Sequence, residues 1–337
     1  MPQSPSPTDK ASGQPFVDLT PDCLLNALDS VGLHSDGRLL ALNSYENRVY
    51  QVGMEDASPV VVKVYRPARW NDAALLEEHG FLAELAQNEL PVVPPLVLQN
   101  GSTLLHFKGF RLAVFPRQGG WVPELNDSGS LERMGRLMAR IHAVGAVRPY
   151  QARPTLDIAS FGEAARDYLL DSPLLPAEMA ESYRSIAQMA LERIRGLFEL
   201  AGEVTAIRLH GDCYPGNVLW TDDGPHLVDF DDSRMGPAIQ DLWMLLSGDR
   251  AERGRQLADL LGGYEDFFDF DTREIQLIEA LRTLRMMNYA AWLAWRWDDP
   301  AFPQAFPWFG KPHYWQQHIL ELREQVAAMD EPPMWSS

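Results

Sequence analysis

The sequence predicts an α+β chain with two lobes, a small strand-rich part followed by a larger, mainly helical part. Three strand-like runs, residues 38–43, 48–52 and 60–65, lie close together near the start of the chain. Apolar residues recur with helical spacing from about residue 128 onwards. With 337 residues, the chain is long enough for two lobes that each bury a core.

Composition suggests where these parts begin and end. Residues 1–15 are rich in Pro and Ser and are expected to form a disordered tail, residues 16–117 the small N-lobe and residues 118–333 the large C-lobe. The tail lacks the basic and apolar segments of a signal peptide, and no apolar run is long enough to span a membrane. Only two cysteines occur, Cys23 and Cys213, which suits a reducing compartment, so we expect a cytoplasmic protein.

The small lobe is expected to begin with a helix and to continue as strands. Thr20 caps that predicted helix, and Pro21 lies in its first turn. Val60–Tyr65 is the strongest strand pattern, because it is rich in β-branched residues. A helical pattern follows over Asp72–Gln87, and Gly109–Pro116 reads as the last strand of the lobe.

The large lobe is expected to be built from amphipathic helices. The first carries an apolar stripe that ends in His142, for which we favour a structural hydrogen bond over a catalytic role. The stripe consists of Leu131, Met134, Leu137, Met138 and Ile141. Two further helices are predicted over residues 161–170 and 176–201.

The C-terminal third is helical and unusually rich in aromatic residues. Trp292, Trp295 and Trp308 favour packing of the last helices against the lobe. The alternative is that they line a substrate groove or a cage for a quaternary ammonium ligand. Asp298-Asp299-Pro300 and Phe306-Pro307-Trp308 are expected to break the helix into a loop that shapes access to the cleft.

Three polar residues stand between these helices at a spacing that indicates chemistry. Asp212 is followed five residues later by Asn217 and twelve further on by Asp229. Phosphoryl transfer from ATP uses such a set: one carboxylate orients the acceptor hydroxyl, and an amide oxygen and a second carboxylate hold Mg²⁺. We therefore expect Asp212 as the proton acceptor, and Asn217 and Asp229 as metal ligands.

The surrounding residues support this interpretation. Val218-Leu219-Trp220 and His226-Leu227-Val228 read as short strands joined by a turn, a hairpin that brings Asn217 and Asp229 towards one end. Each of the three polar residues alone is more often a turn residue than a catalyst. The ordered set with strands in the right places favours a catalytic site.

The motifs resemble those of the kinase superfold. In protein kinases the first motif is His-Arg-Asp-x4-Asn and the second is Asp-Phe-Gly. This chain has His-Gly-Asp-x4-Asn at residues 210–217 and Asp-Phe-Asp at 229–231, which resembles the aminoglycoside-phosphotransferase-like branch. The resemblance implies a bilobal protein-kinase-like fold, with ATP as co-substrate between the lobes.

Four further residues are expected at the nucleotide. Lys63 lies in the strongest strand and is expected to reach the phosphates, although alone it reads as an outward-pointing lysine. Glu78, with Glu77 as runner-up, is expected to pair with Lys63 from the following helix. No glycine-rich loop is present, so Ser44 and backbone N–H groups are expected to contact the phosphates. Phe115 lies where the linker between the lobes is expected to meet adenine.

The segment after the second motif bears on regulation. Residues 229–241 leave no room for a long activation loop, and Gly211 replaces the arginine that reads a loop phosphate, so we expect assembly without activating phosphorylation. Asp241 opens a helix and is expected to brace the catalytic loop. For Cys213 we favour a small buried thiol over a redox switch.

Several longer runs resemble one family in particular, that of bacterial stress response kinase A. They are His-Gly-Asp-Cys-x-x-Gly-Asn-x-Leu-Trp at 210–220, a run at 228–246 that begins Val-Asp-x-Asp-Asp, Leu-Asn-Ser-Tyr-Glu-Asn-Arg-Val-Tyr-Gln at 42–51, and Asp-Pro-Ala-Phe-Pro-x-x-Phe-Pro-Trp at 299–308. The resemblance extends over residues 16–333. Tyr214-Pro215 departs from the His-Ala expected there, which leaves the substrate preference open.

This resemblance implies a Mg²⁺-dependent serine/threonine protein kinase of the stress response, associated with protection from programmed cell death. By motif match, Asp212 is the proton acceptor, Asn217 and Asp229 are metal ligands, and Ser44 is an ATP contact. The expected partners are ATP and a protein with a Ser or Thr hydroxyl, including the chain itself, which is expected to be a monomer.

The net charge of −18 makes nucleic acid and anionic membranes poor partners, because both are polyanions. Two alternative functions remain open. A small-molecule kinase acting on choline, homoserine, a sugar or an aminoglycoside would use the same catalytic residues. A nucleotide-binding regulator without activity is disfavoured, because Lys63, Asp212, Asn217 and Asp229 are all present.

Overall fold

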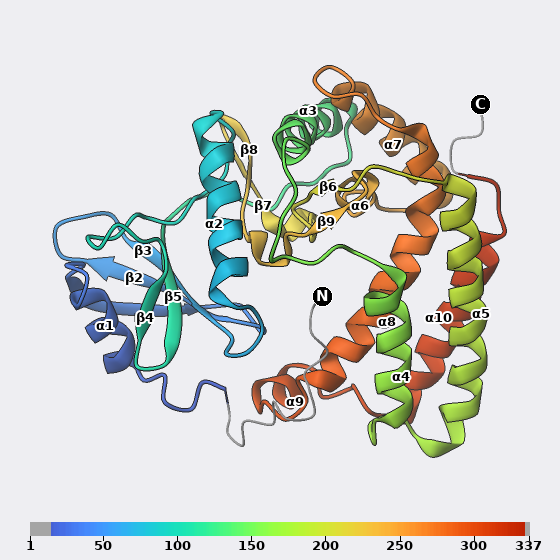
Figure 1. The fold of residues 1–337 in the computed structure, drawn as a ribbon, viewed down its shortest axis with the longest axis horizontal. Coiled ribbons are helices and arrows are strands. Elements are labelled where there is room, and N and C mark those ends of the chain that lie inside the picture. The colour runs from blue at the N-terminus through green and yellow to red at the C-terminus, as the bar shows by residue number, and fades with distance from the viewer. Residues whose placement is uncertain (1–14, 334–337) are drawn as a thin grey trace.

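The structure is a computed structural model that describes residues 15–333. A five-stranded antiparallel sheet forms the first part of the chain, and helices dominate the rest (Figure 1). The two-part α+β architecture predicted from the sequence is therefore confirmed. The predicted disordered tail lies outside the described residues, apart from residue 15.

The sheet has the strand order β1-β2-β3-β5-β4. Its strands are β1 Ser35–Leu42, β2 Arg48–Met54, β3 Val60–Tyr65, β4 Leu105–Phe107 and β5 Phe110–Pro116. The four strands expected from the sequence are present. The short strand β4 was not predicted, because three residues carry too little alternation; a tight turn at Lys108 and Gly109, both with positive φ, joins it to β5.

The two faces of the sheet pack against different helices. Helix α1, Pro21–Asp29, has Thr20 as its N-cap, as predicted, and covers one face with Leu24 and Leu28. Val62 and Val64 of β3 point to this face. Because side chains alternate along a strand, Lys63 and Tyr65 point to the opposite face.

Helix α2, Asp72–Gln87, connects the sheet to the helical part, as Figure 1 shows. Near its start, Ala74 and Leu75 pack with Tyr65 of the sheet. Near its end, Phe81 and Leu85 belong to the large core of the helical part. The position of α2 thus depends on both lobes, and it holds the inner face of the sheet opposite the catalytic segment.

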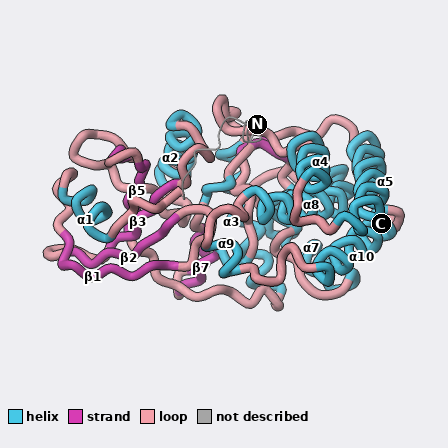
Figure 2. The backbone as a smooth tube through the Cα atoms, turned by 90° about the horizontal axis from the view of Figure 1, so that it is seen from below, coloured by secondary structure: helices cyan, strands magenta, loops and turns pink. Residues whose placement is uncertain are grey.

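The helical part encloses the largest core. Its α-helices are α3 Ser128–Gly145, α4 Ala164–Asp171, α5 Ala177–Ala201, α6 Ile239–Trp243, α7 Arg250–Tyr264, α8 Ile278–Trp295, α9 Ala301–Ala305 and α10 Pro312–Met329. A π-helical turn, Ala159–Glu163, precedes α4. The helices lie at the opposite end of the molecule from the sheet (Figure 2), and the three helices predicted between residues 128 and 201 are confirmed.

Four short strands lie within and on either side of the segment of this helical part that contains Asp212, Asn217 and Asp229. β6 Ile207–Arg208 pairs with β9 Met235–Gly236, and β7 Val218–Thr221 pairs with β8 Gly224–Leu227. The second pair is the predicted hairpin. Between these strands lie 3-10 turns at Pro215–Asn217 and Phe230–Asp232, and a third such turn, Thr272–Leu277, precedes α8. Across residues 15–333, every helix is too short or too polar to cross a lipid bilayer.

Candidate active site

The loop that carries Asp212 is fixed by a buried carboxylate. Asp241 in the first turn of α6 accepts the backbone N–H groups of His210 and Gly211, each at 2.8 Å. His142 Nε2 lies 3.1 Å from Asp241 and His142 Nδ1 lies 2.9 Å from the Tyr264 hydroxyl. The bracing role expected for Asp241 and the structural role expected for His142 are confirmed.

Gly211 has a backbone conformation that explains its identity. Its φ of +87° lies in the left-handed region, and a Cβ atom there would collide with the backbone carbonyl of Asp232. An arginine at this position, as in protein kinases, does not fit this geometry. The loop conformation thus depends on glycine.

Asp212 lies between two neighbours that orient it. Its Oδ1 accepts a hydrogen bond from Arg285 Nη1 of α8 at 2.6 Å, and its side chain is 23% exposed. Its backbone carbonyl accepts Asn217 Nδ2 at 3.0 Å. Burial raises the pKa of Asp212 and the charge of Arg285 lowers it in part, with a net increase above its ordinary value.

Asn217 and Asp229 are brought together by the hairpin. The Val228 backbone N–H donates to the Asn217 carbonyl at 3.1 Å, which ties the end of β8 to the catalytic loop. Asp229 follows with φ of +63°, a left-handed conformation that is uncommon for a residue other than glycine and is found at functional sites. Its side chain is 52% exposed.

Lys63 reaches this carboxylate from the sheet. Its Nζ lies 2.6 Å from Asp229 Oδ1 and 3.6 Å from Asp231 Oδ1, although the lysine side chain is almost fully buried. Burial alone lowers the pKa of Lys63, but the charges of Asp229 and Asp231 outweigh it and hold the pKa well above its ordinary value. A permanently cationic group therefore lies at the inner face of the sheet.

The expected pairing of Glu78 with Lys63 requires correction. Glu78 Oε2 accepts Arg153 Nη2 at 2.5 Å in a fully buried pair, and Asp229 takes the place beside Lys63. Burial raises the pKa of Glu78 to about 6. Glu77 accepts the backbone N–H groups of residues 151–153 instead. Glu78 approaches Lys63 closely enough for its charge to act on the lysine, but without an ion pair.

Ser44 and Phe115, the other residues expected at the nucleotide, both belong to the sheet and its turns. Ser44 is half-buried in the turn between β1 and β2, and Phe115 is the last residue but one of β5. In the sheet, Phe115 pairs with Val61, and its ring lies 6.5 Å from that of His79. Their contacts with ATP remain predictions.

Oxygen ligands suit a magnesium ion between Asn217 and Asp229. In the part of the chain that the structure describes, no cluster of three or more His, Cys, Asp or Glu side chains has metal-binding geometry. The Asn217 side-chain amide donates from Nδ2 to the Asp212 backbone carbonyl, so its Oδ1 is left as a possible ligand. The Asp229 carboxylate is accessible. Mg²⁺ accepts such a sparse protein set, because it takes its other ligands from phosphates and water.

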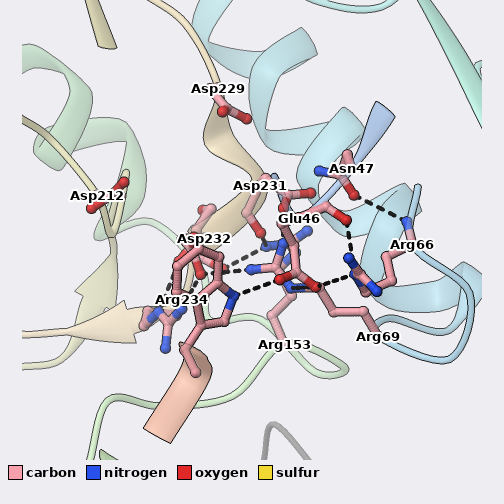
Figure 3. Close-up of polar contacts among 12 residues, drawn as sticks. Glu46, Asn47, Arg66, Arg69, Arg153, Asp212, Asp229, Asp231, Asp232 and Arg234 are labelled. Atoms are coloured by element: carbon pink, nitrogen blue, oxygen red, sulfur yellow. Dashed lines mark hydrogen bonds and ion pairs between the residues drawn. The ribbon is translucent and has the colours of Figure 1, made fainter. Parts of the chain in front are cut away.

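A second group of charges lies beside this site and joins the lobes; Figure 3 labels its members Glu46, Arg66, Arg69, Asp231 and Asp232. We call it the interlobe network; it consists of Glu46, Arg48, Arg66, Arg69, Asp231, Asp232, Arg296 and Asp299. Arg69 pairs with Asp231 and, at 2.9 Å, with Asp232. Arg66 pairs with Asp299 at 2.7 Å.

Glu46 links the network to helix α8. It lies 2.8 Å from Arg296 Nη2 and accepts Trp292 Nε1 at 2.5 Å. Sequence reasoning did not find this network. A signal was present, because the runs at 42–51 and 299–308 had been singled out as family-specific, and the structure shows that they meet where Arg48 approaches Asp299 at 3.3 Å.

Two of the three tryptophans belong to one aromatic cluster. Trp292 and Trp308 both pack on Phe306, with ring centroids 6.0 and 5.8 Å apart, whereas Trp295 contacts Tyr168 at 5.5 Å. These contacts between rings support the packing role favoured from the sequence. Cys213 is fully buried beside Met138 and burial raises its pKa, which fits the structural role favoured from the sequence.

Comparisons with known proteins agree with this geometry. The sequence profile of the phosphotransferase enzyme family matches residues 38–278. Stress response kinase A of Salmonella choleraesuis is 43% identical over 319 residues, which cover 95% of this chain and 96% of the relative. Serine/threonine protein kinase RdoA of Salmonella typhimurium and stress response kinase A of Escherichia coli K12 match with the same identity and coverage.

Solved structures with a similar fold are more distant in sequence. Amicoumacin kinase, in complex with AMP-PNP, Ca²⁺ and amicoumacin, has a TM-score of 0.70 and 18% identity, over 93% of this chain and 95% of its own. A microcompartment-associated aminopropanol kinase has a TM-score of 0.69 and 16% identity, over 91% and 96%. At these identities the likeness confirms the kinase-like fold predicted from the sequence.

Proposed function

The chain belongs to the stress response kinase A family, within the phosphotransferase enzyme family, and we propose that it transfers the γ-phosphoryl group of ATP to serine or threonine hydroxyls of proteins. The observation that carries this proposal is that Lys63, from a distant strand of the sheet, meets the segment that holds Asp212, Asn217 and Asp229. Phosphoryl transfer needs positioning and charge stabilisation by these residue types.

In this proposal each residue has a separate task. Asp212, held by Arg285, orients the acceptor hydroxyl and takes its proton. Asn217 and Asp229 hold Mg²⁺, which neutralises charge on the phosphates when bound. Lys63 exchanges part of its contact with Asp229 for the phosphates, while Ser44 and the backbone of its turn cover them.

The division of labour between the parts of the chain is proposed along the same lines. Residues 16–117 form the N-lobe that grips the nucleotide, with Phe115 at the adenine, and residues 118–333 form the C-lobe for catalysis and acceptor binding. Cys23 and Cys213 are both unpaired and buried, which supports a reducing, cytoplasmic location. We propose a monomer that acts in the bacterial stress response.

A second candidate is phosphorylation of a small molecule. It is favoured by the fold comparisons, because the similar solved structures include an amicoumacin kinase, an aminopropanol kinase and a spectinomycin phosphotransferase. The catalytic residues would be the same for either acceptor.

Transfer of labelled phosphate from ATP with Mg²⁺ tests the proposal. Wild type and Asp212→Ala are incubated with themselves, with a generic basic protein and with a panel of small alcohols that includes amino sugars. Label on protein Ser or Thr that disappears in the variant supports a protein kinase. Label on a small alcohol alone assigns the second candidate, and equal labelling by Asp212→Ala removes Asp212 from the mechanism.

A further inference from the structure

One face of helix α8 joins the catalytic carboxylate to the turn that covers the nucleotide site. Arg285, Tyr289, Trp292 and Arg296 follow one another at intervals of four, three and four residues, so they share one side of the helix. We call this the acceptor face. At one end Arg285 binds Asp212, and at the other Trp292 and Arg296 bind Glu46.

The middle of the acceptor face is open. The side chain of Arg285 is 42% exposed and Tyr289 is 41% exposed. Arg285 uses only Nη1 on Asp212, and its Nε and Nη2 have no acceptor among residues 15–333. The free edge of a guanidinium suits a carboxylate or phosphate group, because its planar N–H groups match two oxygens.

Exposed tyrosines surround this arginine. Burial raises the pKa of Tyr289 and the nearby charge of Arg285 lowers it in part. Burial and the charges of Asp212 and Asp229 raise the pKa of Tyr214 in the catalytic loop, and Arg285 lowers it in part. Tyr45, at the tip of the β1–β2 turn, is also exposed and packs on Phe306 at 4.9 Å. Asp212 is therefore approached past one cation and several aromatic rings.

The carboxylates around this entrance are already neutralised. Glu46 is paired with Arg296, Asp299 with Arg66, and Asp232 with Arg69. Several acidic groups near this entrance are therefore paired with arginines, while Asp229 and Asp232 remain 52% and 38% exposed. On the acceptor face itself the exposed charge is Arg285, so a cationic group placed on this face is repelled.

We propose that the acceptor face binds the peptide segment that receives the phosphoryl group. It selects a hydroxyl that has an anionic group on one side and an aromatic residue on the other. Arg285 takes the anionic group and Tyr289 the aromatic ring. This rests on the proposed protein kinase function and specifies its substrate class, an acidic and aromatic peptide rather than a polycationic amino sugar.

Steady-state kinetics with matched peptides test the proposal. The peptides share one Ser and differ only in its neighbours: Glu, phosphoserine or Lys on one side, and Phe or Gly on the other. Wild type is expected to prefer Glu to Lys, and Phe to Gly, each by about fivefold in kcat/KM, as a partly exposed contact can supply. The phosphoserine peptide shows whether phosphate serves as well as carboxylate.

Two variants separate the two contacts. Arg285→Gln is expected to lose the preference for Glu over Lys while the preference for Phe remains, and Tyr289→Ala is expected to do the reverse. Arg323→Gln, an exposed arginine on α10, is the matched control and keeps both preferences. Because each preference is a ratio within one variant, a general loss of activity or folding does not imitate the result.

The outcomes separate two kinds of failure. If wild type phosphorylates the peptides but prefers Lys, or if Arg285→Gln keeps the preference for Glu, the acceptor face is wrong and the kinase function stands. If wild type labels none of the peptides, the proposed function fails, and the inference falls with it.

Discussion

Two groups of carboxylates lie side by side in this molecule and differ in how completely they are paired. Asp212 and Asp229, both labelled in Figure 3, each form one ion pair among residues 15–333, with Arg285 and with Lys63 respectively. Asp231, only two residues after Asp229, has a side chain that is 7% exposed and lies against both Arg69 and Lys63. For Asp229 and Asp231, pairing and burial rather than residue type separate the proposed reactive carboxylate from the structural one.

The difference has a physical basis. A buried ion pair that loses one partner leaves an uncompensated charge, so the interlobe network resists change. A partly exposed carboxylate with a single partner can exchange that partner for a metal ion or a substrate at modest cost. The candidate site thus has carboxylates that can change partners, and it lies beside the interlobe network, whose ion pairs cannot.

The largest expected effect is on turnover. Asp212→Asn keeps the size of the side chain but removes the proposed base, so phosphate transfer is expected to fall by about 10² to 10⁴-fold. The free energy of unfolding is expected to change by less than about 1 kcal/mol, because the side chain is partly exposed. Single-turnover kinetics and urea denaturation check the two quantities, and a variant that unfolds early would place Asp212 with the structural group.

The next effect is on stability. Arg69→Met removes one cationic partner of Asp231 and of Asp232 and leaves them with Lys63 and Arg234, so the free energy of unfolding is expected to fall by up to about 3–5 kcal/mol. Arg38→Met is the matched control, because Arg38 is 79% exposed and pairs only with Asp36. Urea denaturation measures the free energy of unfolding of both variants. Equal losses would show that the interlobe network does not stabilise the fold.

A smaller effect is expected at the turn between β1 and β2. Glu46→Gln leaves Arg296 and Arg69 with a neutral partner, so the free energy of unfolding is expected to fall by about 1–3 kcal/mol. The KM for ATP is expected to rise, because the turn above the phosphates is less firmly held. Glu55→Gln, in the exposed turn after β2, is the control, and an unchanged KM would separate the network from nucleotide binding.

The smallest effect is a shift in pH dependence. Arg285 lowers the pKa of Asp212, which burial raises, so Arg285→Gln is expected to raise that pKa further. Asp212 must be ionised to accept a proton, and the acid limb of the pH–rate profile therefore moves to higher pH. Profiles of wild type and Arg323→Gln should coincide. A limb that stays in place in Arg285→Gln would assign it to another group.

The elements and the catalytic motif could be predicted because their signals are local. Thr20 capped its helix, the β-branched run around Lys63 formed its strand, and Asp212, Asn217 and Asp229 lie within eighteen positions of one another. Their final roles are set by contacts with Lys63 and Arg285, which come from other parts of the chain.

Long-range ion pairs could not be predicted in the same way. Glu46 and Arg296 are separated by 250 positions, and Arg69 and Asp231 by 162. The expected pairing of Glu78 with Lys63 was wrong for the same reason. Glu78 pairs with Arg153, which lies in a loop that no periodic pattern predicts. The sequence alone does not indicate which oppositely charged residue will pair with a given charged residue in the fold.

The most direct test compares Asp229→Asn with Asp231→Asn, and measures ATP-dependent phosphate transfer and urea unfolding for both. Asp229→Asn is expected to lose phosphate transfer by about 10²-fold or more with little change in unfolding, because it removes a proposed metal ligand that is 52% exposed. Asp231→Asn is expected to lose stability, because Arg69 and Lys63 stay buried without its charge. If both variants lose the same property to the same extent, the separation of reactive from structural carboxylates is contradicted.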